Sequence, residues 1–473
     1  MKKALPFIVA AWVVITAPDT NAQPKKPNII FILADDLGYA DVGCYGQKKI
    51  KTPNIDALAK KGMTFTQFYS GSTVCAPART TFMTGLHTGH AAVRENKTFA
   101  PEGQFPLPDS AITFPMLLQK NGYYTAAFGK WSLGYITTSG DPQKKGFDDF
   151  FGYNCQSLAH SYYPDHLWDN HTRIDYPDNP VLFTHYSADI IHSKALGMIN
   201  SQKDDQPFFL YLPYTIPHAD LTVPHDSVYD NYVKMFNENP LPVPIKKDTA
   251  GKPYEPYPHA AFAAMVSRLD KYVGDIVSLI HQKGMDENTI IIFTSDNGPH
   301  KEGGGDPLFF NNTAGLRGIK RDLYEGGIRE PLIVYWKNHI KAGTVNKQPF
   351  ALWDFYPTFL QLAGIAAPKN TDGISLLPAL LNKKQPIHEF FYWELHESGG
   401  KQAVRWGKWK GVKTGVSIKT DAAIELYDLE TDPFEKNNVA SEYPEIVRKI
   451  ENYMQEAHIY NKDWPLFPSE EKK

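Results

Sequence analysis

Cysteine and surplus positive charge are both scarce in this sequence. Three cysteines occur in 473 residues, and 49 Lys and Arg stand against 52 Asp and Glu, for a net charge of -3. A nucleic-acid-binding surface needs a basic excess, so we expect no nucleic-acid partner. Cys44 and Cys155 could form a disulfide in an oxidising compartment, but two cysteines so far apart in the sequence are more often simply buried.

Long apolar runs are also missing. The one near the start, residues 4–15, is too short to span a bilayer. It follows Met1-Lys2-Lys3 and precedes Thr20-Asn21-Ala22, which is the pattern of a secretory signal peptide cut after about Ala22. No cysteine lies near that cut, and no later run is apolar enough for a membrane helix. We therefore expect residues 1–22 to be removed, and the mature protein to be periplasmic or secreted, without a lipid anchor or membrane insertion.

The apolar runs that are present predict an α/β fold. Several strand-like runs are apolar throughout and alternate with helical segments, which is typical of a parallel sheet covered by helices on both faces. The expected strands are residues 28–33, 64–69, 123–128, 207–211, 289–293 and 332–336, and the expected helices are residues 52–62, 77–85, 114–121 and 260–283.

The last part of the chain differs from the rest in composition and hydrophobic pattern. From about Ile387 it is rich in tryptophan and in short alternating segments such as residues 403–410. These features predict a small antiparallel sheet, with a final helix over residues 443–457 packed on it. Because 473 residues exceed what one core usually supports, we expect a large domain over residues 23–385 and a smaller C-terminal domain over residues 386–473.

Polar and reactive side chains follow the predicted strands at the points where they end. In a doubly wound sheet, ligands bind outside the carboxyl ends of the strands. One such residue is usually a turn or a cap, but five strand ends that deliver them together predict a functional site. The residues concerned are Asp35 and Asp36, Cys75, Lys130, His218, and Asp296 with Asn297.

Four of these residues form a possible metal site. Asp35 and Asp36 from one strand end, with Asp296 and Asn297 from another, make a set of oxygen ligands. Such ligands suit Ca²⁺, and also Mg²⁺, but not zinc. Three carboxylates in one crevice would repel one another without a cation, which favours a metal over a purely structural role.

Cys75 lies in the motif Cys75-Ala76-Pro77-Ala78-Arg79, of the form C-x-P-x-R. Taken alone, it could be a buried cysteine before a helix that starts at Pro77. The same pattern is the one that formylglycine-generating enzymes read in sulfatases, and this stretch resembles it directly. Ala78 replaces the usual Ser but leaves Cys, Pro and Arg intact, so we expect maturation to proceed.

The chain as a whole resembles a type I sulfatase of the alkaline-phosphatase superfamily from about Pro27 to Ala440. The fold implied is a large, mostly parallel sheet between helices, with a smaller C-terminal domain. The order and spacing of several motifs carry the resemblance. These are residues 34–38, 75–79 followed by Thr84-Gly85, Gly129-Lys130-Trp131, Pro217-His218, Ser295-Asp296-Asn297-Gly298, 316–320, 325–329, 426–429 and Asp432-Pro433.

The resemblance also implies a mechanism. Cys75 is expected to be oxidised to formylglycine by a maturation enzyme, and the hydrate of that group, bound to the divalent cation, attacks the sulfate ester. Arg79 is expected to steady the formylglycine. Lys130 and Lys320 are expected to bind the sulfate oxygens, and His218 to protonate the leaving oxygen.

One position departs from the family pattern. Sulfatases of this kind commonly have His two residues after the lysine of Gly129-Lys130-Trp131, and this chain has Ser132 there. His160 is a possible replacement or a sugar-binding residue, although it could equally be an ordinary loop histidine. His300 lies two residues beyond Gly298 and is expected to point toward the substrate.

The expected substrate is a sulfated glycan, and the loop around His160 resembles those of sulfatases that act on galactose-type sugars. Two other functions remain open at this point. One is a phosphate monoester or diester hydrolase of the same superfamily. The other is a non-catalytic, Ca²⁺-dependent glycan-binding protein, which would follow if Cys75 stayed a thiol.

Overall fold

The computed structural model describes residues 25–100, 102–203, 205–241, 255–419 and 421–470. The predicted signal peptide, residues 1–22, lies outside these ranges. Within them, no helix is both long and apolar enough to cross a membrane.

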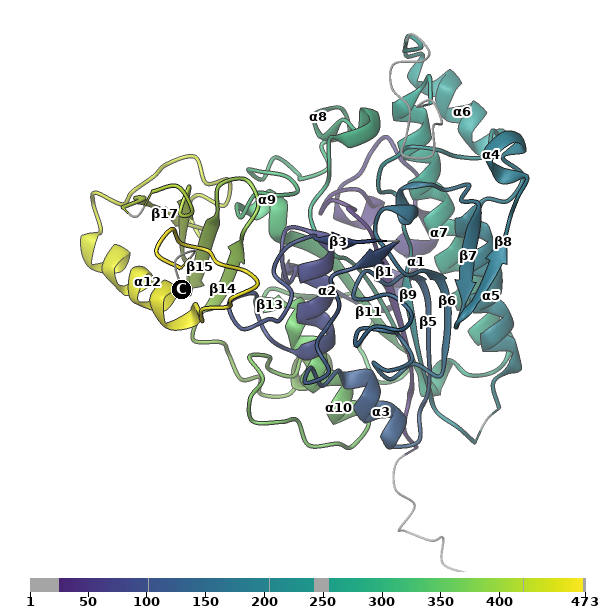
Figure 1. Cartoon of the computed structure of the whole chain (residues 1–473), viewed down its shortest axis with the longest axis horizontal. Helices are drawn as coiled ribbons and strands as arrows, with labels where there is room; N and C mark the ends of the chain where they lie inside the picture. Colours follow the sequence, from purple (N-terminus) through teal and green to yellow (C-terminus); the bar gives the residue numbers. More distant parts are fainter. Residues whose placement is uncertain (1–24, 101, 204, 242–254, 420, 471–473) are drawn as a thin grey trace, which may run out of the picture.

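A central sheet runs through the large domain (Figure 1). Its strand order is β12-β2-β11-β10-β1-β9-β5-β6-β7-β8, and β13 also pairs with β2. The inner strands β10, β1, β9, β5 and β6 are all parallel, whereas β11 is antiparallel to both β10 and β2. The strands are β1 (Asn28–Ala34), β2 (Met63–Tyr69), β5 (Tyr124–Lys130), β6 (Asp149–Tyr153), β7 (His166–Asp169), β8 (Thr172–Asp175), β9 (Phe208–Pro213), β10 (Thr289–Ser295), β11 (Arg329–Trp336), β12 (Thr344–Asn346) and β13 (Phe350–Ala351).

The central strands are apolar throughout because both faces of the sheet are covered. In β1 every residue is buried, and Ile30 and Ile32 belong to one core while Ile29 and Phe31 belong to the other. One core is covered by α1, α5, α6 and α7, and the other by α2, α3, α10 and α11. The bounds are α1 (Pro53–Lys61), α2 (Cys75–Thr84), α3 (Phe114–Lys120), α5 (Ser187–Ser201), α6 (Ser227–Phe236), α7 (Pro258–Gln282), α10 (Phe355–Leu362) and α11 (Leu377–Leu380).

The C-terminal part forms a second sheet, seen at the left in Figure 1. Its four antiparallel strands follow one another in order, and the last long helix packs on them. Trp393 and Phe391 join this sheet to the large domain through a shared apolar cluster with Tyr69 and Trp353. The bounds are β14 (Phe391–Leu395), β15 (Lys401–Trp406), β16 (Trp409–Thr414), β17 (Ile424–Asp428) and α12 (Pro444–Ala457).

The predicted fold class is therefore confirmed. The elements that the sequence did not predict lie at both edges of the sheet, with β6, β7 and β8 at one and β12 and β13 at the other, and on its faces, where α5, α6, α10 and α11 pack. Further short elements are the hairpin β3 (Thr98–Phe99) and β4 (Gly103–Gln104), and the single turns α4 (Asn179–Leu182), α8 (Pro307–Phe310) and α9 (Glu325–Ile328).

Candidate active site

The sheet topology brings the predicted residues to one edge. Because β1, β5 and β10 are parallel, the residues that follow or end them share that edge: Asp35, Lys130 and Asp296. The strand β2 runs in the same direction as β10, since both are antiparallel to β11. The reversed strand β11 begins at the same edge, so the loop before it contributes Lys320.

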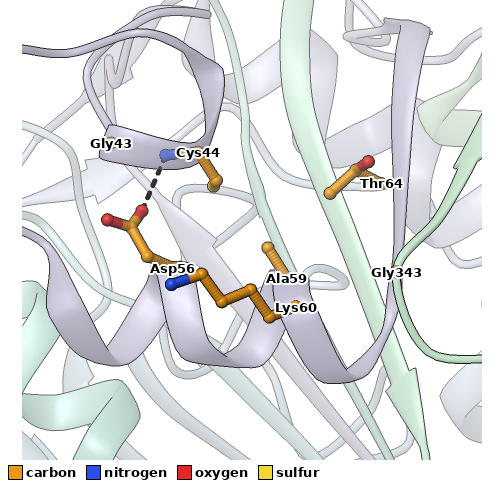
Figure 2. A pocket seen from close by; sticks show the side chains of 7 residues that line it. All are labelled: Gly43, Cys44, Asp56, Ala59, Lys60, Thr64 and Gly343. Carbon is orange, nitrogen blue, oxygen red and sulfur yellow. Dashed lines mark hydrogen bonds between the residues drawn. The ribbon is translucent and has the colours of Figure 1, made fainter.

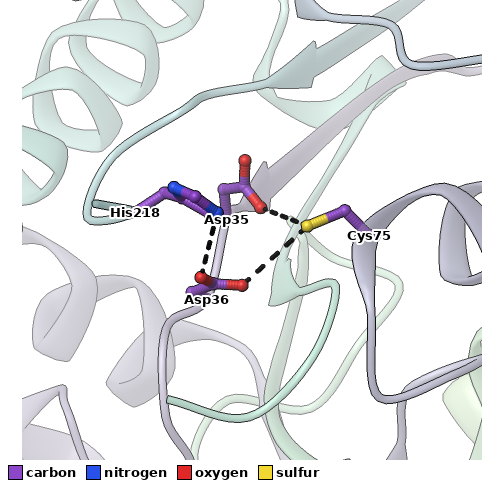
Figure 3. A group of neighbouring side chains, drawn as sticks. All are labelled: Asp35, Asp36, Cys75 and His218. Atoms are coloured by element: carbon purple, nitrogen blue, oxygen red, sulfur yellow. Dashed lines mark hydrogen bonds and ion pairs between the residues drawn. The ribbon is translucent and has the colours of Figure 1, made fainter. Parts of the chain in front are cut away.

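The centre of the site consists of Asp35, Asp36, Cys75 and His218 (Figure 3). Each offers one ligand atom, and these atoms all lie within 4.8 Å of one another. The Cys75 thiol lies 3.2 Å from Oδ1 of Asp35 and 4.0 Å from Oδ1 of Asp36. All four side chains are buried, so this is a water-poor pocket in which charge interactions are strong.

The second predicted pair of metal ligands joins this centre. Oδ1 of Asp296 accepts a hydrogen bond from the Asp36 backbone N–H at 3.1 Å, and the Asn297 amide donates to Oδ1 of Asp36 at 2.6 Å. Oδ1 of Asn297 is buried, and no hydrogen-bond donor reaches it from the described residues. A buried acceptor without a partner is costly, so an unfilled oxygen beside three carboxylates fits a hard divalent cation.

Three cations surround the three carboxylates. The Lys130 ammonium lies 2.6 Å from Asp35, and the Lys320 ammonium lies 2.7 Å from Asp36. The Arg79 guanidinium lies 2.9 Å from Asp296 and 3.5 Å from Asp35. We call these six residues the active-site cluster: Asp35, Asp36, Asp296, Arg79, Lys130 and Lys320.

The cluster shifts the pKa values of its members in different directions. Burial alone would raise the pKa of Asp35, but the surrounding cations, Lys130 foremost, hold it well below its ordinary value. Burial and the charge of Asp35 raise the pKa of Asp296 to about 7. Burial would lower the pKa of Lys320, yet Asp36 raises it, so the ammonium stays charged. The pocket therefore keeps fixed positive charge where an anion can bind.

Cys75 is the first residue of α2, two residues earlier than the predicted start at Pro77. The unpaired N–H groups of a helix start favour negative charge nearby. Even so, burial and the charge of Asp35 raise the pKa of the Cys75 thiol well above its ordinary value. The unmodified side chain is therefore a protonated thiol and a poor nucleophile.

His218 lies between the metal-ligand candidates and Lys320. The Lys320 ammonium donates to Nε2 of His218 at 3.0 Å, and the same nitrogen is 3.3 Å from Asp36. Nδ1 of His218 donates to the Ala219 carbonyl. Burial, with the charge of Lys320, holds the pKa of His218 well below its ordinary value, so the imidazole is neutral and shares the Lys320 proton.

The two histidines predicted to bind substrate flank His218 but differ in their bonding. The ring of His160 stacks on that of His218 with centroids 4.7 Å apart, and its buried Nε2 has no partner among the described residues. The ring of His300 lies 5.6 Å from His218 and donates from Nε2 to the Pro217 carbonyl, while its Nδ1 accepts from the Glu302 N–H. His160 therefore has a ring nitrogen that is free to bind a ligand. Both ring nitrogens of His300 instead form hydrogen bonds, one of them to the turn that carries His218.

Ser132 is fully buried at the place of the family histidine. Its backbone is in the left-handed region, with φ of 61°, as is that of Asp36, and such strain is concentrated at functional sites. The hydroxyl of Ser132 has no partner among the described residues, and neither has the side-chain amide of the adjacent Asn154. Asn154 follows β6, and its carbonyl accepts the Ser132 N–H at 3.2 Å. Asn154 follows a strand end as the predicted site residues do, but β6 was not predicted from the sequence, so Asn154 was not predicted either.

The rim of the site also carries charged residues that the sequence did not single out. The Arg321 guanidinium contacts Glu302 at 2.6 Å and Glu397 at 3.2 Å. Burial would raise the pKa of Glu302, but Lys320 and Arg321 lower it to about 2. Glu302 is therefore an ionised acceptor close to the buried lysines.

The other two cysteines do not pair, and they lie outside this site. Cys155 is buried, but Cys44 is exposed beside a cleft of about 340 Å³. Figure 2 shows this cleft, in which the Cys44 N–H donates to Asp56 at 2.7 Å. Desolvation around the thiol and the charge of Asp56 raise the pKa of Cys44 above its ordinary value, although the residue as a whole is exposed.

Comparisons with known proteins agree with this geometry. A family model described as Sulfatase matches residues 27–365, and one described as N-sulphoglucosamine sulphohydrolase, C-terminal, matches residues 319–459. The N-acetylgalactosamine-6-sulfatase of Rattus norvegicus is 32% identical over 397 residues, which cover 78% of this chain and 68% of that protein. Arylsulfatase A of Homo sapiens is 31% identical over 481 residues, which cover 91% of this chain and 87% of that protein.

A solved structure extends the similarity to almost the whole chain. The crystal structure of Ps i-CgsB superposes with a TM-score of 0.77 at 28% identity, covering 95% of this chain and 96% of that chain. The match reaches well beyond the sheet that carries the active-site cluster. The chain therefore belongs to the sulfatase family of the alkaline-phosphatase superfamily, and the protein is a sulfatase that hydrolyses sulfate esters.

Proposed function

We propose that this sulfatase removes an O-sulfate group from a sulfated carbohydrate, using formylglycine made from Cys75 and a divalent cation. The observation that carries the proposal is the position of Cys75. It starts α2 within 3.2 Å of Asp35, inside a buried cluster of three carboxylates and three cations.

The residues for the cation would be Asp35, Asp36, Asp296 and Asn297. The set is entirely oxygen, and the partnerless Oδ1 of Asn297 completes it, which suits Ca²⁺ or Mg²⁺. When bound, such a cation neutralises the carboxylates and lowers the pKa of a coordinated hydroxyl group.

Conversion of Cys75 follows from both motif and chemistry. The C-x-P-x-R pattern is intact, and the raised pKa of the thiol makes the unmodified side chain a poor nucleophile. The proposal therefore requires a formylglycine-generating maturation enzyme as a partner. Arg79, in the turn above Cys75, would hold the modified side chain in place through its fixed contacts with Asp35 and Asp296.

The remaining groups would act on the sulfate and the leaving group. The charged ammonium groups of Lys130 and Lys320 would bind the sulfate oxygens and stabilise the charge that accumulates on them. His218 and Lys320 share a proton, and this pair would deliver it to the departing sugar oxygen. His160, with its free Nε2 stacked beside His218, would contact the substrate.

The carbohydrate substrate is supported by the relatives and by the rim. A further solved structure of Ps i-CgsB, at the same TM-score, is a complex with k-i-k-neocarrahexaose, and the rat relative is named for N-acetylgalactosamine 6-sulfate. At the rim, Glu302 and Arg321 offer an ionised acceptor and a donor for sugar hydroxyl groups. Export to the periplasm or the medium, with cleavage after about Ala22, fits such a substrate, and N-terminal sequencing of the mature protein tests it.

Two measurements on protein from the native host test the proposal. Mass analysis of the tryptic peptide that carries Cys75 should show formylglycine, which is lighter than cysteine. A panel of sulfated mono- and oligosaccharides, with matched phosphate esters, should show sulfate release that Cys75→Ala abolishes and Cys155→Ala leaves intact. An unmodified Cys75 peptide, or activity that survives Cys75→Ala, would refute the mechanism, and preferential phosphate release would refute the substrate class.

A further inference from the structure

A second group of possible metal ligands lies at the far end of α2. His87 and His90 follow the helix, and Asp372 comes from the segment before α11. Their ligand atoms lie within 4.8 Å of one another. The ten residues of α2, at about 1.5 Å each, put this group roughly 15 Å from Cys75, so it is separate from the active-site cluster.

The backbone holds the three side chains together. Gly85 ends α2 in the left-handed conformation, and its carbonyl accepts the Asp372 N–H at 2.9 Å. The His87 N–H donates to Oδ2 of Asp372 at 2.9 Å, and the His90 N–H donates to the His87 carbonyl in a turn. This turn stacks the two imidazole rings, whose centroids are 4.1 Å apart. The two histidines, spaced His-x-x-His, and one carboxylate thus lie on one side of a fixed turn.

The bonding of His87 is incomplete. Nδ1 of His90 lies 2.9 Å from both oxygens of Asp372, a normal hydrogen bond. Nε2 of His87 lies 3.7 Å from Oδ2 of Asp372, which is too far for one. Nδ1 of His87 is buried without a partner among the described residues, and the whole side chain is only 8% exposed. The buried Nδ1 without a partner shows that hydrogen bonds do not fully account for the place of this imidazole, and Nε2 faces Asp372 without bonding to it, so this nitrogen can accept a metal ion.

We propose that His87, His90 and Asp372 bind a first-row transition-metal ion, with Zn²⁺ the best match. Two imidazoles and one carboxylate are the ligands that zinc takes in three-ligand sites, with a water molecule as the fourth. The donor set also separates this site from the all-oxygen set at Asp35 and Asp296, which suits harder ions. Asp372 and His90 are 20% and 26% exposed, so an ion can reach the site from solvent.

The surroundings of the site connect it to both parts of the fold. His87 packs edge-on against Trp353 and against Tyr392 of β14. The carbonyl of Gly89 accepts the N–H of Ile459, which follows α12. A bound ion would therefore tie the end of the helix that begins at Cys75 to the junction between the two domains.

Equilibrium dialysis of the full-length protein against Zn²⁺, in the presence of excess Ca²⁺, tests the proposal. We expect one Zn²⁺ per chain and a rise in melting temperature. His90→Ala and Asp372→Asn should weaken this binding at least about 100-fold, more than the loss of an outer hydrogen-bond partner costs, and should abolish the rise. His90 is partly exposed, so its variant tests the ligand without opening a core cavity.

His171→Ala is the matched control, because His171 forms a His–Asp pair with Asp141 but belongs to neither group of possible metal ligands among the described residues. It should bind Zn²⁺ like the parent protein. Equal Zn²⁺ binding by the parent and His90→Ala would overturn the proposal and leave only a structural hydrogen bond between His90 and Asp372. Binding that is lost in Asp35→Asn but kept in His90→Ala would also overturn it, because the ion would then lie in the active-site cluster.

Discussion

Two of the buried charge clusters among the described residues differ in their roles. Besides the active-site cluster, a junction cluster links the large domain to the C-terminal sheet. Its centre is Lys410 of β16, whose ammonium lies 2.9 Å from both Glu325 and Glu435. The other members are Arg329, which contacts Glu325, and Arg405, which donates to the hydroxyl of Tyr69.

The comparison shows that buried charge alone does not identify a catalytic site. Both clusters are buried, and the stretch from residue 316 to 329 contributes to both, with Lys320 in one and Glu325 and Arg329 in the other. The junction cluster neutralises its carboxylates across a domain boundary, as structural ion pairs do. The active-site cluster instead surrounds a thiol at a helix start, and a group of possible metal ligands lies at its centre.

Removal of divalent cations should have the largest effect on activity. Chelation followed by desalting should lower kcat/KM at least about 100-fold, because the three carboxylates then repel one another and compete for Lys130 and Lys320. Adding back Ca²⁺ or Mg²⁺ should restore the rate, and comparing the two ions shows which is preferred. Full activity in protein shown to be metal-free would contradict the cation assignment.

Substitution of one lysine from each cluster separates their roles. Lys320→Ala should lower kcat/KM about 100- to 1000-fold, which is typical for the loss of one group that stabilises developing charge. Lys410→Met should leave kcat within a few-fold but destabilise the fold by about 3–5 kcal/mol, because Glu325 and Glu435 lose their shared cation. Initial rates and urea unfolding of both variants measure this. A Lys410→Met protein that is fully folded and inactive would contradict the separation of a catalytic cluster from a structural one.

Loss of the His160 side chain should have a smaller effect. Because its free Nε2 is proposed to bind substrate rather than take part in the chemistry, His160→Ala should lower kcat/KM by about 10-fold, the cost of one hydrogen bond, mainly through KM. His171→Ala serves as the control, since that histidine is mostly exposed on the surface. An unchanged KM for His160→Ala on the best substrate would show that His160 only supports the ring of His218.

The junction cluster should affect stability at neutral pH rather than activity. Burial and the charge of Glu325 raise the pKa of Glu435 to about 7, although Lys410 opposes the shift. A carboxyl group whose pKa rises on folding stabilises the protein fully when the pH is below its pKa in the unfolded chain, 4.5. This contribution is lost as the pH rises toward its pKa in the folded protein, about 7.

Glu435→Gln should therefore remove the loss of stability that the parent protein shows as the pH rises toward 7. The variant should gain stability relative to the parent between pH 5 and 8, on the order of 2 kcal/mol, with kcat unchanged. Urea unfolding across this range provides the measurement. A stability difference that does not change with pH would show that Glu435 is already ionised in the folded protein.

The residues that the sequence predicted best are those that end buried strands. Asp35, Lys130 and Asp296 could be placed together because continuous apolar runs mark central parallel strands, whose carboxyl ends share one edge. Asn154 occupies an equivalent position but was missed, since β6 is a five-residue strand whose first residue is polar. Short strands depend on their neighbours for stability, so local sequence carries little of their signal.

Hydrogen-bond partners could not be read from the sequence in the same way. His160 and His300 were both predicted to bind substrate, but in the structure only His160 keeps a free ring nitrogen. Similarly, the sequence does not reveal that the Tyr427 hydroxyl, in the motif at residues 426–429, accepts from Arg317 at 2.7 Å. Contacts between residues so far apart in the chain follow from packing, not from spacing.

The sequence by itself determined the chemistry available to this protein: the C-x-P-x-R motif, the acidic strand ends, and the alternation that places them at one sheet edge. The tertiary structure decided which charges meet. It directed Lys320 to Asp36 and Lys410 to Glu325, buried the Cys75 thiol so that it stays protonated, and left the ring Nδ1 of His87 without a partner among the described residues. The physical reason is that periodicity and strand direction are local properties, whereas burial and charge pairing arise only when distant segments pack together.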